Sequence, residues 1–469
     1  MNASGTQLRE LRQRIGLSQS KLAQLSGISQ HLLSAFELEK AALPESLLEV
    51  LSQSLADNEK VAAIANRRKR YREHQYDNVE VCPNRVARAV ATPGNPQYRR
   101  VLDDIAKRHL SQEPRDWSAL SLFSGCGGFS LGFSAAGFAV KGFVELVPEL
   151  RNIYQHNFRN SAEVGGDITK IDEATLSNLA TSLGEIDVII GGPPCQGFSL
   201  AGKRQADDPR NTLFKHYLRF VDSVRPKFAV LENVRLLTSM KNPRGAFVKD
   251  DICEEFRTHG YRMECFEVNA RDYGVPQHRE RVLFVAVRDD LGLSPSIPLP
   301  THSVNRDLFA ETSRLRTFAD ACSDLPFLES GGQSDDSLHQ AVTHPAHVIE
   351  WLWDVPEGAS AHENEDPAKR PPSGYNTTYK RQVWNEPAGT VQTTFGMISG
   401  CRNVHPIATR SLTIREAARI QSFPDSFRFV GSLGIIRTGI GNAVPPLLAF
   451  AVGQHLRQLL SNVVKVPRR

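Results

Sequence analysis

The sequence predicts an α/β domain with a doubly wound sheet, preceded by a small all-α domain. Between residues 117 and 290, short apolar runs alternate with helical segments. The first run, 118–123, leads into the glycine turn 124–128, a strand-to-helix connection that is common in nucleotide-binding folds. Residues 5–57 instead contain only short helical patterns, which predicts a separate helical domain.

Composition and charge place the chain among globular proteins. Hydrophobic residues make up 40% and charged residues 23% of its 469 residues, a length that suggests roughly two to four domains. The net charge of +4 and the pI of about 8.6 permit a nucleic acid partner without requiring one. No apolar run has the length of a transmembrane helix, and no signal peptide is expected at the N-terminus. The 7 cysteines include no CxxC pair, so we expect no metal site and a reduced, cytoplasmic protein without a membrane partner.

Residues 1–58 are predicted to form a helix-turn-helix domain. Leu8 and Leu11 keep helical spacing, and Ser18 and Ser29 stand where they would cap the next two helices. Gly27 lies between those helices and would allow a tight turn. The segment resembles the small helix-turn-helix domains of phage-type repressors.

That resemblance implies DNA contacts in the N-terminal domain. Gln19 and Gln30 stand near the starts of the two central helices, where such domains contact phosphates and bases. An accessory helical bundle without a DNA role stays open, because few Lys or Arg residues fall in the recognition helix. Residues 59–116 are interpreted as a basic linker. Its cluster RRKRYR at 67–72 would track phosphates, or would be a solvated helix face.

The most specific single feature is a cysteine that follows a buried strand. The apolar run 186–190 is stopped by the sequence GGPP at 191–194, so Cys195 is predicted on a rigid loop at the carboxyl end of a strand. Open α/β sheets place their chemistry at that end of their strands. We therefore expect Cys195 to be a reactive thiol.

From residue 117 to about 455 the chain resembles the C5-cytosine DNA methyltransferases, because short motifs occur in the order typical of that family. These motifs are FSGCGGFSLGF (123–133), Glu145, GDI (166–168), PPCQGFS (193–199), DPRN (208–211), ENV (232–234), QHRER (277–281), REAARIQSFP (415–424) and GNAVPP (441–446). The resemblance implies a Rossmann-like, S-adenosylmethionine-dependent catalytic domain at 117–299 that residues 410–469 complete. It also implies a small mixed target-recognition domain at 300–409.

The resemblance further implies a reaction. A methyl group would pass from S-adenosylmethionine to C5 of a cytosine in duplex DNA, after the base is flipped out of the helix. Cys195 would attack C6 and make C5 nucleophilic. Glu232 would donate a proton toward N3, with Asn233 holding the loop. Arg281 would hold O2 of the base and the Glu232 carboxylate, and Arg279 would take a phosphate or orient the loop.

The methyl donor is expected in a pocket built from both ends of the catalytic region. Phe123 would stack on the adenine, while Gly125 and Gly127 would let the methionine portion lie against the backbone. Glu145 would accept hydrogen bonds from the ribose hydroxyls, and Asp167 from the adenine amino group. The complete expected set is Phe123, Gly125, Gly127, Gly128, Glu145, Leu146, Asp167, Ile168, Pro194, Leu213, Asn442 and Val444.

Two further regions are expected to contact DNA. Loop 199–210 is interpreted as a mobile lid over the flipped base. Its basic residues are Lys203, Arg204 and Arg210. In the target-recognition domain, Arg381 is the best candidate for a DNA contact, with a solvated loop arginine as the alternative, and Thr390 is expected in a strand near the DNA backbone. No recognition sequence follows, because base readout depends on geometry.

The sequence leaves the biological role open among three alternatives. The first is a DNA methyltransferase that serves restriction-modification or host marking, with any cognate restriction endonuclease acting as a separate protein. The second is a transcriptional repressor whose N-terminal domain binds its own promoter. The third is an RNA cytosine-5 methyltransferase on the same scaffold; the long variable segment and the N-terminal domain favour DNA.

Overall fold

The computed structural model describes residues 4–14, 18–56, 95–194, 213–242, 245–304, 312–372 and 374–464. The chain divides into two compact units, an N-terminal helical unit and a larger unit that includes 95–344 and 351–464. The helices described between residues 4 and 56 of the N-terminal unit are α1 (Gly5–Arg14), α2 (Gln19–Ser26), α3 (Gln30–Glu37) and α4 (Glu45–Ala56).

The N-terminal unit has a small apolar core of its own. Leu22, Leu33 and Leu51 are fully buried in it. Ser29 caps α3, because its side chain accepts a hydrogen bond from the backbone N–H of Leu32 at 3.3 Å. Gly27 follows α2 with φ 69°, a left-handed conformation that glycine adopts without strain. The turn predicted at Gly27 and the cap predicted at Ser29 are therefore confirmed.

The larger unit is organised around one sheet. Its strands are β1 (Trp117–Leu122), β2 (Phe138–Val144), β3 (Ala162–Gly165), β4 (Val188–Gly191), β5 (Phe228–Val234), β6 (Tyr261–Asn269) and β7 (Glu280–Arg288). They form a 7-stranded sheet in the order β3-β2-β1-β4-β5-β7-β6. All neighbours up to β5 are parallel, whereas β7 runs antiparallel to both β5 and β6. The predicted α/β sheet is thus confirmed as a mixed sheet, and β6 is a strand that the sequence patterns did not single out.

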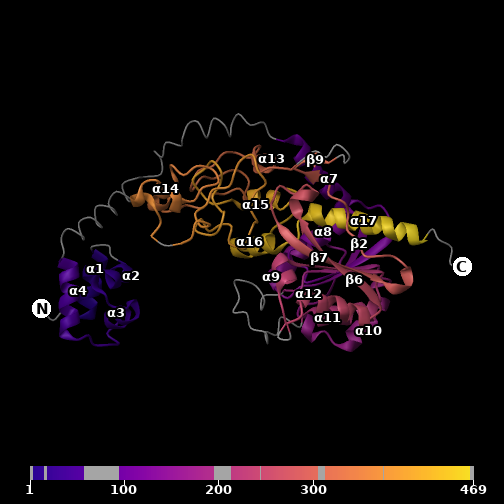
Figure 1. The fold of residues 1–469 in the computed structure, drawn as a ribbon, viewed down its shortest axis with the longest axis horizontal. Helices are drawn as coiled ribbons and strands as arrows, with labels where there is room; N and C mark the ends of the chain where they lie inside the picture. Colours follow the sequence, from indigo (N-terminus) through magenta and orange to yellow (C-terminus); the bar gives the residue numbers. More distant parts are fainter. Residues whose placement is uncertain are drawn as a thin grey trace. The chain divides into compact units, whose positions relative to one another are not determined.

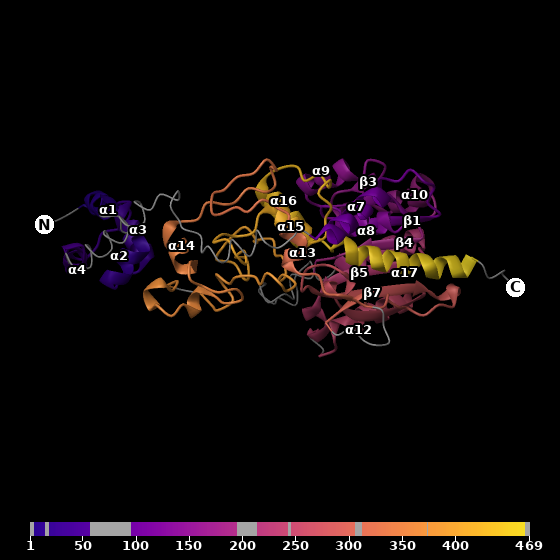
Figure 2. The same ribbon diagram turned by 90° about the horizontal axis from the view of Figure 1, so that it is seen from above.

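Helices cover both faces of the sheet (Figures 1 and 2). The helices after residue 95 are α7 (Pro96–Leu110), α8 (Gly128–Ala135), α9 (Pro148–Asn157), α10 (Glu173–Leu183), α11 (Leu213–Val224), α12 (Val248–Thr258), α13 (Phe318–Cys322), α14 (Ala346–Leu352), α15 (Ile414–Ile420), α16 (Leu433–Asn442) and α17 (Pro446–Val464). Alternating residues of the central strands supply two apolar cores. Ile190 faces the core that α7, α8, α9 and α17 help to form, and Ile189 faces the core shared with α10, α11 and α12.

Helix α7 corrects part of the predicted linker. The sequence between 59 and 116 was expected to be a basic linker, but residues 96–110 form a helix that belongs to the larger unit. Asn95 caps this helix, and Tyr98, Leu102 and Ile105 are buried in the core. The three apolar residues recur at helical spacing among many charged ones, so the basic composition hid the buried face.

The C-terminal helix packs against the first helix of the sheet domain. In Figures 1 and 2, α17 runs alongside α8. A Cβ at Gly132 of α8 would lie 2.4 Å from the Cβ of Ala449, and a Cβ at Gly453 of α17 would lie 2.8 Å from that of Ala136. Glycine therefore permits a close approach of the two helices, and this approach brings residues 441–446 to the sheet.

Residues 312–409 contain little regular structure. The short elements there are β9 (Ser313–Arg314), which pairs with β8 (His302–Ser303), then α13, α14 and the 3-10 turns η8 (Ala361–Glu363) and η9 (Pro367–Lys369). Other 3-10 turns in the described ranges are η2 (Ile168–Lys170), η5 (Arg235–Ser239), η6 (Ala270–Tyr273) and η7 (Asp289–Leu291). A buried ion pair stabilises the end of the irregular region, because both Nη atoms of Arg410 donate to the Glu416 carboxylate at 2.8 and 2.7 Å.

Within the described ranges, no single helix is long and apolar enough to cross a membrane. The helices α16 and α17 pass that test only as a pair bent by 41°, and on length and composition alone. Both helices contribute buried residues to the apolar core, including Ile440 and Leu448. The apolar character of this pair is therefore that of core helices.

Candidate active site

The carboxyl ends of four parallel strands meet at one edge of the sheet. Leu122 of β1 pairs with Val144 of β2 and with Gly191 of β4, and Gly191 pairs with Leu231 of β5. The residues that follow these positions are Phe123, Glu145, Gly192 and Glu232. Strand register therefore gathers residues predicted for the cofactor and for catalysis at the edge where open α/β sheets bind ligands.

Glu232 and Arg281 form an ion pair at this edge. The Nε of Arg281 lies 2.7 Å from Oε1 of Glu232, and both side chains are mostly buried, with 14% and 11% exposed. The antiparallel register explains the contact, because Arg281 of β7 stands opposite Val234, two residues after Glu232 on β5. The contact lacks the alignment of a hydrogen bond, so buried Oε1 of Glu232 accepts no hydrogen bond from the described part of the chain.

The backbone before Cys195 lies against the Glu232 strand. A Cβ at Gly192 would lie 3.3 Å from Oε2 of Glu232, so glycine lets the carboxylate approach the loop closely. The next residue of β5, Asn233, donates from Nδ2 to the carbonyl of Pro193 at 2.9 Å. The predicted role of Asn233 in holding this loop agrees with that contact. Cys195 itself lies outside the described residues.

Arg279 has a different role from the phosphate contact considered for it. Its side chain is 1% exposed, so it cannot reach a DNA phosphate. Its guanidinium donates to the carbonyls of Val391, Gly441 and Ala443 at 3.0–3.1 Å. Burial is the main cause that lowers the pKa of Arg279. These hydrogen bonds link residue 391 to Gly441 in α16 and to Ala443, which follows the helix. The loop-orienting role that the resemblance implied for Arg279 stays a prediction.

Gln277 completes this junction, and the sequence had given it no role. Its Oε1 accepts a hydrogen bond from the backbone N–H of Val391 at 2.9 Å, and its Nε2 donates to Oε1 of Gln421 at 2.8 Å. Gln421 in turn donates to the carbonyl of Ile440 at 2.6 Å. The amides of Gln277 and Gln421 lie in two of the matched motifs, which is the signal that would have indicated a shared structural role.

Glu145 has the surroundings expected of a ribose ligand. It is 7% exposed, and its two oxygens accept hydrogen bonds from the backbone N–H groups of Gly125 at 2.7 Å and Val147 at 2.9 Å. Burial raises the pKa of this carboxyl, while these backbone donors lower it. Each oxygen keeps acceptor capacity beyond its one backbone donor. The carboxylate is thus fixed in orientation and still able to bind a diol.

The glycines of the turn after β1 have two different roles. Phe123 has φ 52°, a strained conformation for a side-chain-bearing residue that often marks a ligand site. Gly125 has φ 55° and faces open space, with no atom within 4 Å of an added Cβ. Added Cβ atoms at Gly127 and Gly128 would instead lie 2.5 Å from the Phe158 ring and 2.4 Å from the carbonyl oxygen of Val444. A ligand was expected to approach the backbone closely at Gly125 and Gly127. Only Gly125 fits this expectation, because Gly127 has to be glycine to let Phe158 pack against it.

The other residues expected at the cofactor are divided between exposed and buried positions. Leu146 is 63% exposed at the edge, whereas Ile168 is buried at 4%. Asp167 caps η2, with Oδ1 accepting from the backbone N–H and the hydroxyl of Thr169 at 3.0 and 2.7 Å. These hydrogen bonds lower the pKa of Asp167 and keep it an acceptor. Partly buried Pro194 and Leu213 flank the undescribed segment 195–212.

The C-terminal segment reaches the same glycine turn. The carbonyl of Val444 lies against Gly128, while Asn442, the last residue of α16, is exposed. A fixed carboxylate at Glu145, an acceptor at Asp167 and open space beside Gly125 suit the hydroxyls, the amino group and the chain of S-adenosylmethionine. These residues fit the cofactor that the sequence implied.

The structure corrects the DNA contact expected of Arg381 and the strand expected at Thr390. Arg381 is fully buried and donates to the carbonyls of Leu352, His405 and Ala408 at 2.7–3.0 Å. It is neither a DNA contact nor a solvated loop arginine, because its charge is satisfied by backbone carbonyls. Thr390 is exposed but lies in no strand, and its hydroxyl donates to the carbonyl of His278 at 2.8 Å.

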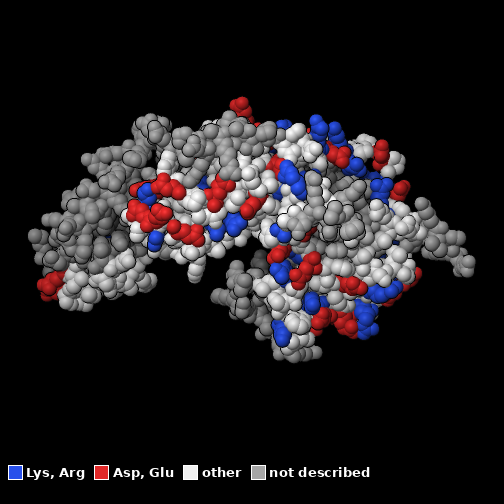
Figure 3. All heavy atoms as spheres, turned by 45° about the horizontal axis from the view of Figure 1, so that its top comes forward, with Lys and Arg blue, Asp and Glu red and all other residues white. Residues whose placement is uncertain are grey.

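The remaining expected DNA contacts differ in accessibility. Gln19 donates to Oε2 of Glu37 at 2.8 Å and so is held within the helical unit, whereas Gln30 is exposed at the start of α3. The three basic residues of the expected lid, Lys203, Arg204 and Arg210, lie outside the described residues. Acidic side chains gather over the segment with η8 and η9, which includes exposed Glu365 and Asp366 (Figure 3). That surface would repel DNA phosphates.

Among the described residues, no cluster of three or more His, Cys, Asp or Glu side chains is arranged to hold a metal ion. The charged groups at the sheet edge instead pair with one another or with backbone groups, as Glu232 does with Arg281 and Glu145 with Gly125.

Residues 117–458 match the family model "C-5 cytosine-specific DNA methylase". The chain is 37% identical over 347 residues to the Type II methyltransferase M1.HphI of Haemophilus parahaemolyticus, covering 73% of this chain and 87% of that protein. It is 35% identical over 383 residues to the Type II methyltransferase M.DdeI of Desulfomicrobium norvegicum, covering 73% and 89%. A solved structure of a DNA modification methyltransferase encoded within an E. coli prophage shares the fold, with a TM-score of 0.57, 27% identity and coverage of 74% and 100%. Together with the geometry of the sheet edge, these matches show that the chain belongs to the C-5 cytosine-specific DNA methylase family and is a DNA (cytosine-5-)-methyltransferase that uses S-adenosylmethionine.

Proposed function

We propose that this enzyme is the modification methyltransferase of a type II restriction-modification system and methylates one specific site in duplex DNA. Two of its relatives, each covered over more than four fifths of its length, bear the name Type II methyltransferase. The cognate endonuclease would be a separate protein. Such a modification enzyme would act on its target wherever the site occurs in the host genome.

Cys195 is the proposed nucleophile. Its sulfur, after loss of the thiol proton, bonds to C6 of the flipped cytosine, and the electrons of the C5–C6 double bond shift toward C5, N3 and O2. Glu232 donates a proton toward N3, and Arg281 stabilises the charge at O2. S-adenosylmethionine, when bound, supplies the methyl group that C5 accepts. Loss of the C5 proton then lets the sulfur leave and restores the aromatic ring.

The observation that best supports this assignment is the mostly buried pair of Glu232 and Arg281. Oε1 of Glu232 lies 2.7 Å from Nε of Arg281 but accepts no aligned hydrogen bond from any described residue, so it keeps the capacity to bind a ligand. The Arg281 guanidinium lies beside that oxygen, and the backbone of Gly192 lies beside the other. A cytosine edge, with N3 and O2 side by side, would satisfy the carboxyl and the guanidinium together.

Expression in a methylation-free host, followed by bisulfite sequencing of the genome, tests the proposal. We expect complete methylation at one short sequence with the wild-type chain and none with Cys195→Ala. Cys253→Ala is the matched control, because Cys253 lies on α12, outside the residues assigned to the site and outside the proposed target-recognition domain. Methylation by Cys195→Ala at the wild-type level would exclude Cys195 as the nucleophile. Methylation at scattered cytosines would exclude a site-specific modification enzyme.

A second candidate function, transcriptional repression by residues 1–58, is supported by the separate core of the N-terminal unit. Helices α2 and α3 are joined by a short turn at Gly27, and the start of α3 exposes Gln30 and His31. We infer that this unit is a helix-turn-helix domain that binds the promoter of its own gene. Deletion of residues 1–58 should abolish promoter binding and preserve methylation, and Cys195→Ala should do the reverse. Loss of both activities on deletion would contradict this modular arrangement.

Residues 300–409 are proposed to be the target-recognition domain, and 410–469 the segment that completes the catalytic domain. Replacing 300–409 by the corresponding segment of a relative should change the methylated sequence while preserving methyl transfer. A tritium-methyl assay that compares duplex DNA with tRNA distinguishes a DNA substrate from an RNA substrate. Incorporation into tRNA alone would overturn the proposed substrate class.

A further inference from the structure

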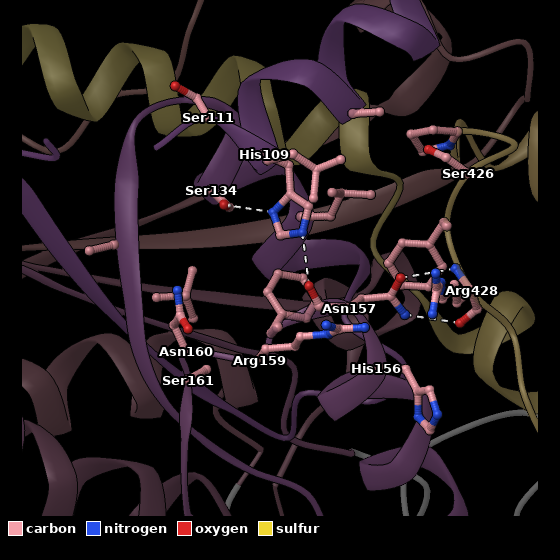
Figure 4. Close-up of a pocket in the computed structure, with 18 of the residues that line it drawn as sticks. His109, Ser111, Ser134, His156, Asn157, Arg159, Asn160, Ser161, Ser426 and Arg428 are labelled. Carbon is pink, nitrogen blue, oxygen red and sulfur yellow. Dashed lines mark hydrogen bonds between the residues drawn. The ribbon is translucent and has the colours of Figure 1, made fainter. Parts of the chain in front are cut away.

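A cavity of about 770 Å³ lies at the opposite edge of the sheet from the candidate active site. The last residues of α7, the end of α8, the first residues of β2, the end of α9 and residues 424–428 surround it (Figure 4). Because β2 begins at this edge and ends at Val144 beside the glycine turn, the strand separates the cavity from the cofactor site. The cavity is therefore distinct from the pocket assigned to the methyl donor.

The described lining of the cavity carries basic side chains and no acidic ones. Its basic residues are His109, Arg115, Lys141, His156, Arg159 and Arg428. Apolar residues form part of the wall as well, among them Phe158 and Phe427. Fixed positive charge beside an apolar wall favours a ligand that combines an anionic group with a flat or apolar body.

No carboxylate among the described residues pairs with Arg115, whose positive charge lies at the base of the cavity. Arg115 donates from Nη1 to the carbonyls of Ser134 and Phe138, at 2.8 and 2.6 Å, and from Nη2 to that of His109, at 2.8 Å. The Ser134 hydroxyl also accepts from Arg115 and lies 2.8 Å from Nδ1 of His109. Carbonyls and a hydroxyl orient this guanidinium but leave its net charge, so an anion in the cavity would be stabilised.

Two more arginines stand at the cavity with unused donors. The guanidinium groups of Arg159 and Arg428 are exposed and make no hydrogen bond or ion pair with any residue that the structure describes. The backbone at Arg428 is nevertheless fixed, because Asn157 donates to its carbonyl and accepts from its N–H, both at 2.9 Å (Figure 4). A fixed backbone lowers the entropic cost of placing the side chain on a ligand.

We propose that this cavity binds a small phosphate-bearing ligand of nucleotide size. Arg159 and Arg428 contact the phosphates as forked donors, and Arg115 adds positive charge behind them. The base lies against the accessible apolar wall at Leu110 and Val140. A cavity of this volume falls within the usual range of about 300–1,000 Å³ for small-molecule sites. Duplex DNA would instead require an extended basic face. DNA phosphates are nevertheless the alternative ligand of these arginines, and the experiment must distinguish them from a nucleotide.

The test is isothermal titration of the full-length protein with ADP, in the presence of saturating S-adenosylhomocysteine to block the cofactor site. We expect one ADP per chain. The double variant Arg159→Ala/Arg428→Ala should bind at least about tenfold more weakly, because each lost charge-assisted hydrogen bond is worth about that factor. The matched control Arg257→Ala/Arg262→Ala removes two exposed arginines of α12 and β6, and the same net charge, and should bind ADP like the wild type. Adenosine, which lacks phosphate, should bind at least about tenfold more weakly than ADP.

Unchanged S-adenosylhomocysteine binding by the double variant shows that it is folded. Absence of ADP binding to the wild type, or equal ADP binding by the double variant, would overturn the proposal. A duplex of A·T pairs only, which offers no cytosine, tests the alternative ligand. If that duplex, and not ADP, loses affinity in the double variant, the arginines contact a DNA backbone and the proposal is wrong.

Discussion

Nε of Arg281 lies 2.7 Å from Oε1 of Glu232, and this oxygen accepts no aligned hydrogen bond from any residue that the structure describes. The two residues come from antiparallel strands 49 positions apart in the sequence, and the register of β5 and β7 brings them together. The pair offers a carboxyl and a guanidinium side by side at a mostly buried position. Such a pair can bind a ligand in which one atom accepts a proton and a neighbouring atom develops negative charge.

Glu232→Gln should slow methyl transfer by roughly 10²- to 10⁴-fold, because an amide cannot donate a proton as an acid. Single-turnover transfer of a tritiated methyl group to duplex DNA measures this rate. Glu267→Gln, which changes an exposed acid on β6, should leave the rate unchanged. A wild-type rate for Glu232→Gln would remove Glu232 from the catalytic residues.

Arg279→Ala should lower the free energy of unfolding by roughly 2–4 kcal/mol, because buried carbonyls of Val391, Gly441 and Ala443 would lose their donor. Urea unfolding followed by tryptophan fluorescence measures the change. Arg262→Ala, which removes an exposed ion pair with Asp289, should change stability by no more than about 0.5 kcal/mol. Equal stability of the two variants would mean that the junction at Val391 is not held by Arg279.

Gly128→Ala should weaken S-adenosylhomocysteine binding and reduce stability by roughly 1–3 kcal/mol. The new methyl group would lie 2.4 Å from the carbonyl oxygen of Val444 and would push the glycine turn and the C-terminal segment apart. Gly434→Ala in α16 is the control, since its nearest neighbour would be 4.0 Å away and alanine favours a helix. Titration calorimetry and thermal unfolding compare the two variants. Wild-type behaviour of Gly128→Ala would show that the turn tolerates a wider separation.

His344 should make stability depend on pH. Burial lowers the pKa of His344 to about 4, and its Nε2 accepts a hydrogen bond from the backbone N–H of Ser411 at 3.1 Å. The unfolded state takes up a proton near pH 6.5 and the folded state only near pH 4, so this contribution is complete above about pH 6.5. It is lost as pH falls from about 6.5 to 4, by up to about 3 kcal/mol.

Urea unfolding midpoints at pH 7.5 and 5.0 measure this dependence. His344→Gln should lower stability at pH 7.5 but reduce the difference between the two pH values. His156→Gln, which changes an exposed histidine, should preserve the wild-type difference. An unchanged pH dependence in His344→Gln would show that other groups cause the acid lability.

The sequence by itself determined the α/β domain, and its motifs predicted the site residues, of which Cys195 lies outside the described part of the chain. The fold inference succeeded because it depends on local chemistry: apolar runs bounded by glycine and proline. The glycine turn after β1, the carboxylates Glu145 and Glu232 and the end of the chain at α17 all follow from residues adjacent in sequence. The buried face of α7 was missed because charged residues outnumber the three apolar ones that define it.

The tertiary structure alone decided which charged side chains are available to a ligand. Arg279, Arg281 and Arg381 are indistinguishable as residue types, yet only Arg281 reaches the Glu232 carboxylate, while Arg279 and Arg381 bind backbone carbonyls inside the protein. Strand register and long-range packing set these partners, and neither is encoded in the neighbours of each arginine. The basic cavity between α7, β2 and residues 424–428 has the same origin, because it joins segments separated by more than 260 positions in the sequence.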